Sequence, residues 1–288
     1  MSMPSDSKII DLMLGIPSDD QNTWYDYMKP QLLDDESRNL FSMPAQYMFN
    51  VPDLKDIENG TAYTLEQMDR HGIARAMIGI AGDPSRTHER ALKDHPDRFF
   101  ASYECVPNLG MEEVRRIRHL KAEYDIKAVT GFPSGLNPQV PINDKRWYPI
   151  YAACVDLDIP VCLCVGVPGP RLPMEPQKVE HLDEVCWFFP ELKIVMRHGG
   201  EPWADLACKL MLKYPNLYYS TSAFAPKHYP QNIIDFANTR GADKIMYAGY
   251  YPMGISLERT FQDMPGVSFK DEVWPKFLYQ NAERVFKL

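Results

Sequence analysis

One short run of this sequence is the best candidate for acid–base chemistry, Arg197-His198-Gly199-Gly200-Glu201-Pro202-Trp203. His198 follows an apolar stretch directly, and the two glycines after it let the backbone turn tightly. The imidazole titrates nearer to neutral pH than any other side chain, so His198 is a candidate general acid or base, with Glu201 close by. The alternative is a histidine that is only hydrogen-bonded at the rim of the fold.

Residues that could bind a carboxylate follow two other apolar runs. Arg171 ends the stiff loop Gly166–Arg171, where it is either a carboxylate clamp with two parallel hydrogen bonds or a solvated surface arginine. Lys227 and His228 follow the run that ends at Ser222, and they either bind a carboxylate or cap the next helix. Trp203 is grouped with them as a substrate-binding candidate.

These side chains need a frame that brings the ends of several strands together. Eight short apolar runs alternate with amphipathic stretches, which predicts right-handed crossovers and a parallel sheet whose strands are buried on both faces. The predicted strands are Lys8–Leu14, Arg75–Ile80, Arg98–Val106, Ile126–Phe132, Pro160–Gly166, Leu192–Arg197, Leu217–Ser222 and Lys244–Gly249. The predicted helices are Leu65–His71, Pro84–His95, Met111–Tyr124, Trp147–Leu157, Val179–Phe189, Trp203–Lys213 and Gln231–Arg240.

Eight such units favour one α/β domain over residues 1–288, a (β/α)8 TIM barrel. A doubly wound sheet would call for Gly-x-Gly-x-x-Gly after an early strand, and the sequence has none. Gly15–Gly60 is a long insertion after the first strand, predicted to be a packed flap that also lines the substrate entrance. Asp271–Leu288 is predicted to form closing helices. Active sites of such barrels lie at the C-terminal ends of the strands.

Composition excludes several classes of function. Lys and Arg number 31 against 39 Asp and Glu, a net charge of −8, so the basic stripe of a nucleic-acid-binding protein is missing. No apolar stretch approaches the roughly 20 residues of a membrane span, and the first residues lack the features of a signal peptide, so a cytoplasmic location is expected. The six cysteines include no Cys-x-x-Cys pair and predict neither a disulfide framework nor a structural zinc site.

Four segments, in this order and spacing, resemble the amidohydrolase-related branch of the amidohydrolase superfamily, which includes aminocarboxymuconate-semialdehyde decarboxylase and the resorcylate-type decarboxylases. The segments are Ile9–Asp11, Phe189–Gly200, Lys244–Met253 and Asn281–Phe286. The resemblance implies a (β/α)8 barrel that usually holds one divalent metal, typically zinc. It also implies decarboxylation or hydrolysis of small carbonyl or carboxylate compounds.

The metal-ligand positions that the resemblance assigns are altered in this sequence. Met13 and Gly15 stand where the first strand of the family carries two histidines, Cys164 replaces the histidine of the fifth strand, and Tyr250 replaces the aspartate of the eighth. Only the strand-six histidine, His198, is retained. Zinc needs three or four nitrogen, oxygen or thiolate donors, so we expect no catalytic metal and no other cofactor.

Without a metal, the resemblance leaves acid–base and electrostatic catalysis, which we assign to His198, Glu201 and Tyr250. Tyr250 either donates a hydrogen bond to a developing oxyanion or fills the vacant metal cavity. Cys164 is a nucleophile only if His198 lowers its pKa, and a buried inert thiol is the favoured interpretation. Cys164 and Met13 are therefore grouped with the substrate-binding candidates.

The expected function is metal-independent decarboxylation, or hydrolysis, of a small carboxylated or phenolic substrate. The alternatives are a metal-dependent hydrolase with an atypical site and a barrel that binds a ligand without catalysis. The resemblance, together with the apolar residues Trp274, Phe277 and Leu278 in the closing segment, also predicts a homodimer.

Overall fold

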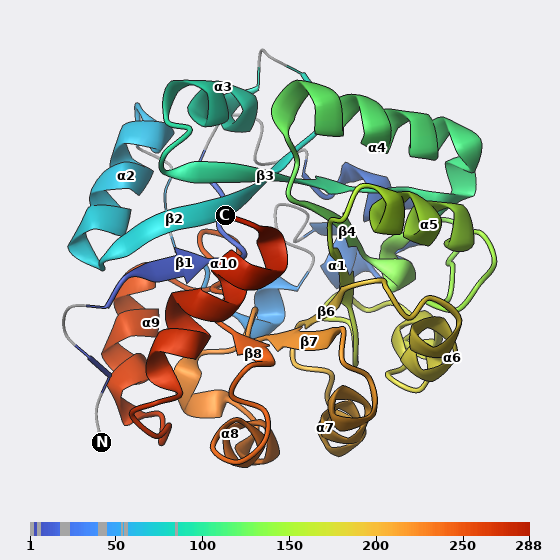
Figure 1. Cartoon of the computed structure of the whole chain (residues 1–288). Helices are drawn as coiled ribbons and strands as arrows, with labels where there is room; N and C mark the ends of the chain where they lie inside the picture. Colours follow the sequence, from blue (N-terminus) through green and yellow to red (C-terminus); the bar gives the residue numbers. More distant parts are fainter. Residues whose placement is uncertain are drawn as a thin grey trace.

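A single curled sheet of eight parallel strands forms the centre of the molecule, with the strands in sequence order (Figure 1). The computed structural model describes residues 3–4, 7–17, 24–39, 45–52, 54, 57–83 and 86–288. The sheet closes on itself, because the Leu12 N–H donates to the carbonyl oxygen of Tyr247 and Leu14 forms a parallel bridge with Tyr251. The predicted TIM barrel is confirmed. Its strands are β1 (Ile9–Asp11), β2 (Ile73–Ile80), β3 (Phe99–Glu104), β4 (Ala128–Gly131), β5 (Val161–Cys164), β6 (Ile194–Arg197), β7 (Leu217–Ser220) and β8 (Ile245–Met246).

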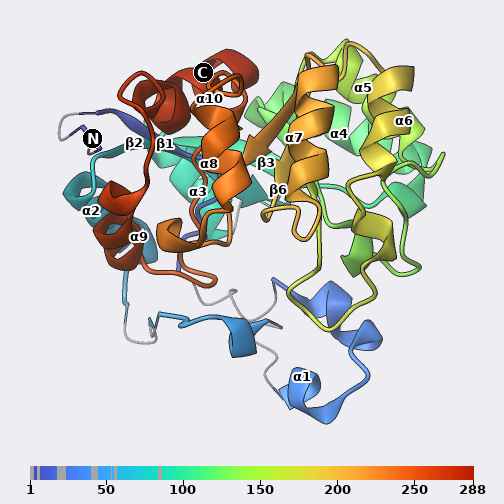
Figure 2. The same cartoon turned by 90° about the horizontal axis from the view of Figure 1, so that it is seen from below.

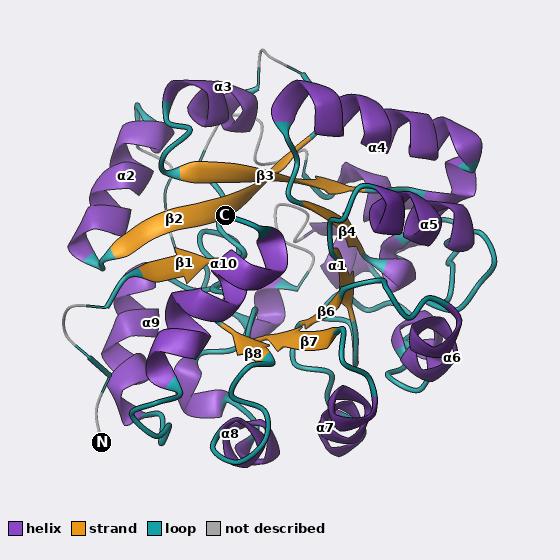
Figure 3. Cartoon of the chain, in the orientation of Figure 1, coloured by secondary structure: helices purple, strands orange, loops and turns teal. Residues whose placement is uncertain are grey.

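Helices surround this barrel, one or more after each strand (Figure 3). The seven helices predicted from the sequence are present with ends shifted by a few residues, and the third, α4, has both predicted ends; Pro84 lies outside the described residues. The helix after β8 was not predicted. The helices around the barrel are α2 (Gly60–Arg70), α3 (Thr87–Asp94), α4 (Met111–Tyr124), α5 (Tyr148–Asp156), α6 (His181–Phe188), α7 (Ala204–Lys213), α8 (Gln231–Ala237) and α9 (Leu257–Asp263).

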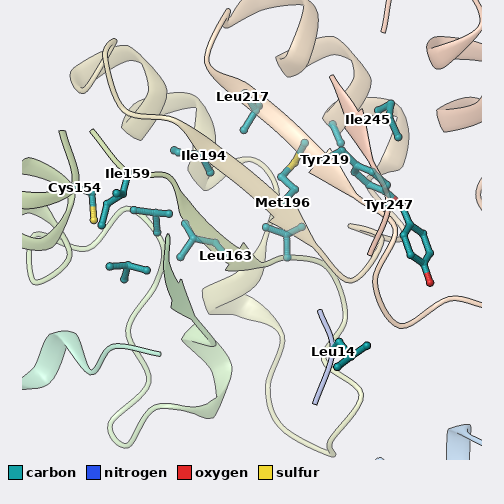
Figure 4. Packing of buried hydrophobic residues seen from close by; sticks show 14 of the residues in the cluster. Leu14, Cys154, Ile159, Leu163, Ile194, Met196, Leu217, Tyr219, Ile245 and Tyr247 are labelled. Atoms are coloured by element: carbon teal, nitrogen blue, oxygen red, sulfur yellow. The ribbon is translucent and has the colours of Figure 1, made fainter. Parts of the chain in front are cut away.

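Side chains along each strand alternate between the space outside the barrel and its interior. On β6, Ile194 and Met196 pack in the large outer cluster between sheet and helices (Figure 4), whereas Val195 belongs to the smaller inner cluster. Because successive side chains of a strand point to opposite faces, Arg197 shares the inner face with Val195. The strand therefore carries a cation to the inside of the barrel at its C-terminal end.

The two ends of the barrel are covered differently. The C-terminal helix α10 (Asn281–Phe286) closes the N-terminal end of the strands, with Val285 and Phe286 in the inner cluster. The segment that contains α1 (Asp35–Asn39) lies at the opposite end (Figure 2). Trp274, Phe277 and Leu278 are fully buried within the chain, so the apolar side chains that suggested a homodimer are accounted for by the core. The homodimer itself stays a prediction.

The insertion after β1 has helical turns of its own, η2 (Asp26–Gln31), α1 and η3 (Gln46–Met48). Arg171, in the loop after β5, anchors it through ion pairs of 2.6 Å with Asp34 and 2.8 Å with Glu36. Of its aromatic residues, Phe41 lies outside the described part of the chain. No helix among the described residues is both long enough and apolar enough to cross a membrane.

Candidate active site

A cavity of about 1010 Å³ opens at the C-terminal ends of the strands, where barrel active sites lie. Residues from the ends of β1, β3, β5, β6 and β8 form its floor. The insertion forms much of its wall, which agrees with the prediction that the flap lines the entrance. The floor and wall residues used below are Met13, Tyr25, Tyr27, Phe49, Glu104, Phe132, Cys164, Arg197, His198, Lys227, His228 and Tyr250.

A buried cation lies in the floor of this cavity. Arg197 ends β6, pairs in register with Cys164 of β5, and is only 7 % exposed. Its Nη2 lies 2.7 Å from the sulfur of Met13, a weak acceptor, and its Nε has no hydrogen-bond partner. Among the described residues, no carboxylate pairs with this guanidinium. The barrel thus holds an unpaired positive charge that faces the cavity.

His198 follows Arg197 and turns its ring into the same space. Its backbone has a φ of +64°, an uncommon conformation for a residue other than glycine, so the ring does not continue the strand's alternation. Ser222 fixes the ring, because its Oγ accepts from the His198 backbone N–H at 3.0 Å and lies 3.2 Å from Nδ1.

The pKa of His198 is lowered to about 3, because burial disfavours the charged ring and the positive charge of Arg197 repels a second one. The sequence argument assumed a histidine that titrates near neutral pH. In the free protein the ring is instead neutral over the whole range from pH 5 to 8. A nearby negative charge is needed before it can hold a second proton.

Tyr250 stands beside His198, with the two rings edge to face and their centres 5.5 Å apart. Its hydroxyl interacts with that of Tyr25, a residue of the insertion. Burial raises the pKa of Tyr250 well above its usual value, so the hydroxyl keeps its proton. Phe49 also packs against the Tyr250 ring, with the ring centres 5.3 Å apart.

Cys164 and Met13 also line the floor. Burial raises the pKa of the Cys164 thiol to about 12, the opposite of what a nucleophile needs, so the structure supports the inert thiol. Across the cavity, Glu104 at the end of β3 accepts a hydrogen bond of 3.1 Å from the hydroxyl of Tyr27. Glu104 is thus the carboxylate of the floor, and Tyr27 connects it to the insertion.

The other predicted site residues lie at the rim or outside the cavity. Lys227 and His228 are exposed at the rim, on the turn after β7. Glu201 is exposed and Trp203 packs against the outer core, and neither lines the cavity. Arg171 does not line it either, because Asp34 and Glu36 already hold its guanidinium. The structure therefore brings His198, Tyr250, Cys164 and Met13 together at the floor. Lys227 and His228 line the rim of the same cavity, and the other three candidates do not line it.

The cavity also contains four residues that are not among the candidates from the sequence: Arg197, Glu104, Tyr25 and Tyr27. A usable signal was present for the first two, since a charged residue follows alternating inward residues at the end of a buried strand. No comparable signal marks Tyr25 and Tyr27, because their place depends on how the insertion folds back over the barrel.

One buried carboxyl holds the first and last strands in register below the cavity. Asp11 is fully buried, and its Oδ1 accepts hydrogen bonds from the backbone N–H groups of Met13 at 2.9 Å and Gly249 at 2.8 Å. Burial raises its pKa from 3.8 to about 6, against the effect of those hydrogen bonds. Asp11 is thus a positioning residue for Met13 and for the strand that leads to Tyr250.

The raised pKa of Asp11 gives a pH-dependent term in stability. Between about pH 4 and pH 6 the folded state binds more protons than the unfolded state, so this term favours folding at low pH and is lost as the pH rises through 6. Asp11→Asn keeps the acceptor oxygen and removes the charge. We expect the free energy of unfolding of the variant to gain on the order of 3 kcal/mol relative to the wild type between pH 4 and pH 8. Urea unfolding of both proteins across this range measures the difference, and parallel curves would contradict the assignment.

The cavity floor is not suited to hold a divalent metal. No group of three or more His, Cys, Asp or Glu side chains that could hold a metal ion occurs in the described part of the chain. At Gly15, an added Cβ would lie 3.0 Å from atoms of Pro252 and Trp24, so this position has no room for a ligand side chain. Arg197 adds a positive charge beside Met13, which repels a cation. The donor set and the local charge therefore both disagree with a metal site.

Comparisons with known proteins agree with this architecture. The model of the amidohydrolase family (Amidohydro_2) matches residues 49–288, a range that begins after β1 and so leaves out Met13 and Gly15. A comparison with curated protein sequences gives no match.

Solved structures share the fold at low sequence identity. An uncharacterised TIM-barrel protein from Bordetella bronchiseptica is 23% identical with a TM-score of 0.78, covering 97% of this chain and 98% of its own. A 5-carboxyvanillate decarboxylase from Sphingomonas paucimobilis is 15% identical with a TM-score of 0.68, covering 98% and 99%. A dihydroxybenzoic acid decarboxylase from Polaromonas sp. JS666, which contains bound manganese and the inhibitor 2-nitroresorcinol, is 18% identical with a TM-score of 0.64, covering 98% and 97%.

Proposed function

Because the chain belongs to the amidohydrolase family, and is therefore an enzyme of the hydrolase or carboxy-lyase kind, we propose that it removes a carboxylate from a small aromatic acid. The resemblance that the sequence suggested is confirmed at the level of the family. The observation that carries the proposal is the convergence of an unpaired cation, an imidazole and a phenol, from Arg197, His198 and Tyr250, in one cavity.

The shape and lining of the cavity support an aromatic acid. Its volume of about 1010 Å³ accommodates a single-ring compound, and aromatic side chains such as Phe132 and Phe49 offer flat apolar surface to a ring. Among the polar groups of the lining, Arg197, His198 and Tyr250 lie together at the floor. Both similar decarboxylases named above act on aromatic acids by their names, a chemistry that this lining also fits.

The properties of His198 favour loss of CO2 over hydrolysis. Hydrolysis without a metal needs a base that takes a proton from water, and an imidazole with a pKa near 3 is a weak base. Decarboxylation needs a proton donor instead. An anionic substrate offsets the charge of Arg197 and so raises the pKa of His198 on binding, which produces the imidazolium in the complex.

The proposed reaction replaces the carboxylate with a proton at one carbon of the substrate ring. The bond between the ring carbon and the carboxylate carbon breaks and CO2 leaves, while the ring carbon takes the proton from Nε2 of His198. The other proton of the imidazolium, on Nδ1, is donated to Ser222 Oγ. After the transfer, Nε2 of His198 takes a new proton from water. Tyr250 donates a hydrogen bond to the substrate oxygen on which negative charge develops. No part of this step uses a metal ion.

A screen of carboxylated phenols and aromatic diacids tests the proposal. We expect at least one compound to release CO2, measured with substrate labelled with ¹³C at the carboxyl group. In D₂O, the decarboxylated product should carry one deuterium at the carbon that held the carboxylate. Incorporation of ¹⁸O from water into a cleaved ester, lactone or amide, with no CO2 released, would instead assign the chain to the hydrolases and overturn the proposal.

A further inference from the structure

The feature of the cavity with no counterpart in the sequence argument is the guanidinium of Arg197. It is 7 % exposed, its Nε has no partner, and its Nη2 contacts only the thioether of Met13 among the described residues. A buried charge without a partner destabilises the folded protein. We expect such a group where an anionic ligand from outside the chain pairs with it.

The position of this charge matches the altered metal-ligand positions. Arg197 touches Met13, is paired in register with Cys164, and exerts its charge on Cys164, His198 and Tyr250. These residues stand at positions where the resemblance assigns metal ligands, and His198 is the one that is retained. Among these positions, the positive charge is therefore supplied by an arginine side chain and not by a metal ion.

We propose that Arg197 is the anion-binding residue of the cavity. Its guanidinium holds the anionic oxygen that the substrate keeps after CO2 has left, an inference that rests on the proposed function. A planar guanidinium binds a carboxylate or a phenolate–carboxylate edge through two parallel N–H donors. The substrate is thus a small aromatic compound with two acidic groups, a diacid or a carboxylated phenol.

The reaction chemistry decides which oxygen Arg197 holds. The leaving carboxylate loses its charge as it becomes CO2, so a cation bound to it would stabilise the ground state more than the transition state and slow the reaction. An oxygen that stays on the ring keeps or gains negative charge, and a cation bound there stabilises the transition state. A substrate with one carboxylate and no second acidic group would not meet this requirement.

Binding measurements by calorimetry at pH 7.5 test the inference with two matched pairs of probes. The anions are benzene-1,3-dicarboxylate and benzoate, the acid that remains after one of its carboxylates has left, and their neutral counterparts are benzene-1,3-dicarboxamide and benzamide. We expect the wild type to bind at least one anion more than tenfold more tightly than its amide. Arg197→Met should weaken that anion by about 10- to 100-fold, the range for a hydrogen-bonded charged group, and leave the amide unchanged. Arg197→Lys should retain part of the preference.

Arg75→Met is the matched control. Arg75 is a half-buried arginine of β2 whose guanidinium stacks on Phe100, a residue of the inner cluster, with its centre 5.4 Å from the ring, and it does not line the cavity. This variant should bind the anions as the wild type does. The melting temperature without ligand gives a second readout, because removal of an unpaired buried charge should not lower it. A structural role would instead lower the melting temperature of Arg197→Met and leave its preference for anions intact.

The outcomes separate this inference from the proposed function. If no anion is preferred over its amide, or if Arg197→Met keeps the preference, the inference is wrong whatever the activity shows. If the preference depends on Arg197 but the screen shows hydrolysis, the anion site stands and the proposed carboxy-lyase reaction fails.

Discussion

Replacement of His198 by alanine is expected to lower kcat by about 10²- to 10⁴-fold, the usual contribution of a positioned proton-transfer group. The His198 imidazole lies in the cavity floor and can take a proton in the complex and release it to a carbon of the substrate ring. His198→Gln, which keeps a hydrogen-bond donor but cannot titrate near neutrality, should be almost as damaging. Turnover of the compound found in the screen measures both variants.

His119→Ala is the matched control for this prediction. His119 lies on the outer surface of α4, where it pairs with Glu123 at 2.8 Å, so its loss should leave kcat at the wild-type value. The fold of His198→Ala should stay intact, because its ring lies at the mouth of the barrel. A His198→Ala enzyme that turns over as fast as the wild type would make the histidine structural and place the chemistry elsewhere.

Removal of the Tyr250 hydroxyl is expected to have the second largest effect. Tyr250→Phe should lower kcat by about 10²- to 10³-fold, the loss usually seen for one oxyanion donor, with a much smaller change in KM. The hydroxyl is suited to this role because Tyr250 lines the cavity beside His198 and burial keeps its hydroxyl protonated.

Two comparisons show whether the hydroxyl or the ring of Tyr250 matters. Tyr148→Phe, on the outer side of the barrel where the ring stacks on Phe188, should have no effect. Tyr25→Phe removes only the hydroxyl that interacts with Tyr250 and should cost less than Tyr250→Phe. Near wild-type kcat for Tyr250→Phe would show that the ring only fills space next to His198.

The alternation of apolar runs and amphipathic stretches was sufficient to predict the barrel, because strands buried on both faces leave continuous apolar runs. The pattern predicted both ends of α4, Met111 and Tyr124, at the observed residues, and it predicted all eight strands. Strand ends were predicted too long, as at Lys244–Gly249 where β8 is Ile245–Met246, because apolar residues continue into loops that lie over the barrel mouth.

The site was predictable only where side chains follow directly from strand ends. His198, Tyr250, Cys164 and Met13 were placed correctly together, since parallel strands bring their C-terminal ends to one rim. Arg171 was not, because the carboxylates that hold it come from an insertion 135 or more residues away in sequence. The lowered pKa of His198 was also beyond the sequence, since it depends on burial and on a neighbouring charge that has no partner.

The central claim is that the fixed charge of Arg197 and the imidazole of His198 do the work without a metal ion. It is tested most directly by measuring, on one preparation, the metal content by inductively coupled plasma mass spectrometry and the turnover before and after treatment with a chelator. We predict far less than one zinc or manganese ion per chain and the same kcat in both states. Close to one ion per chain, lost together with activity on chelation and restored with it on readdition, would contradict the account.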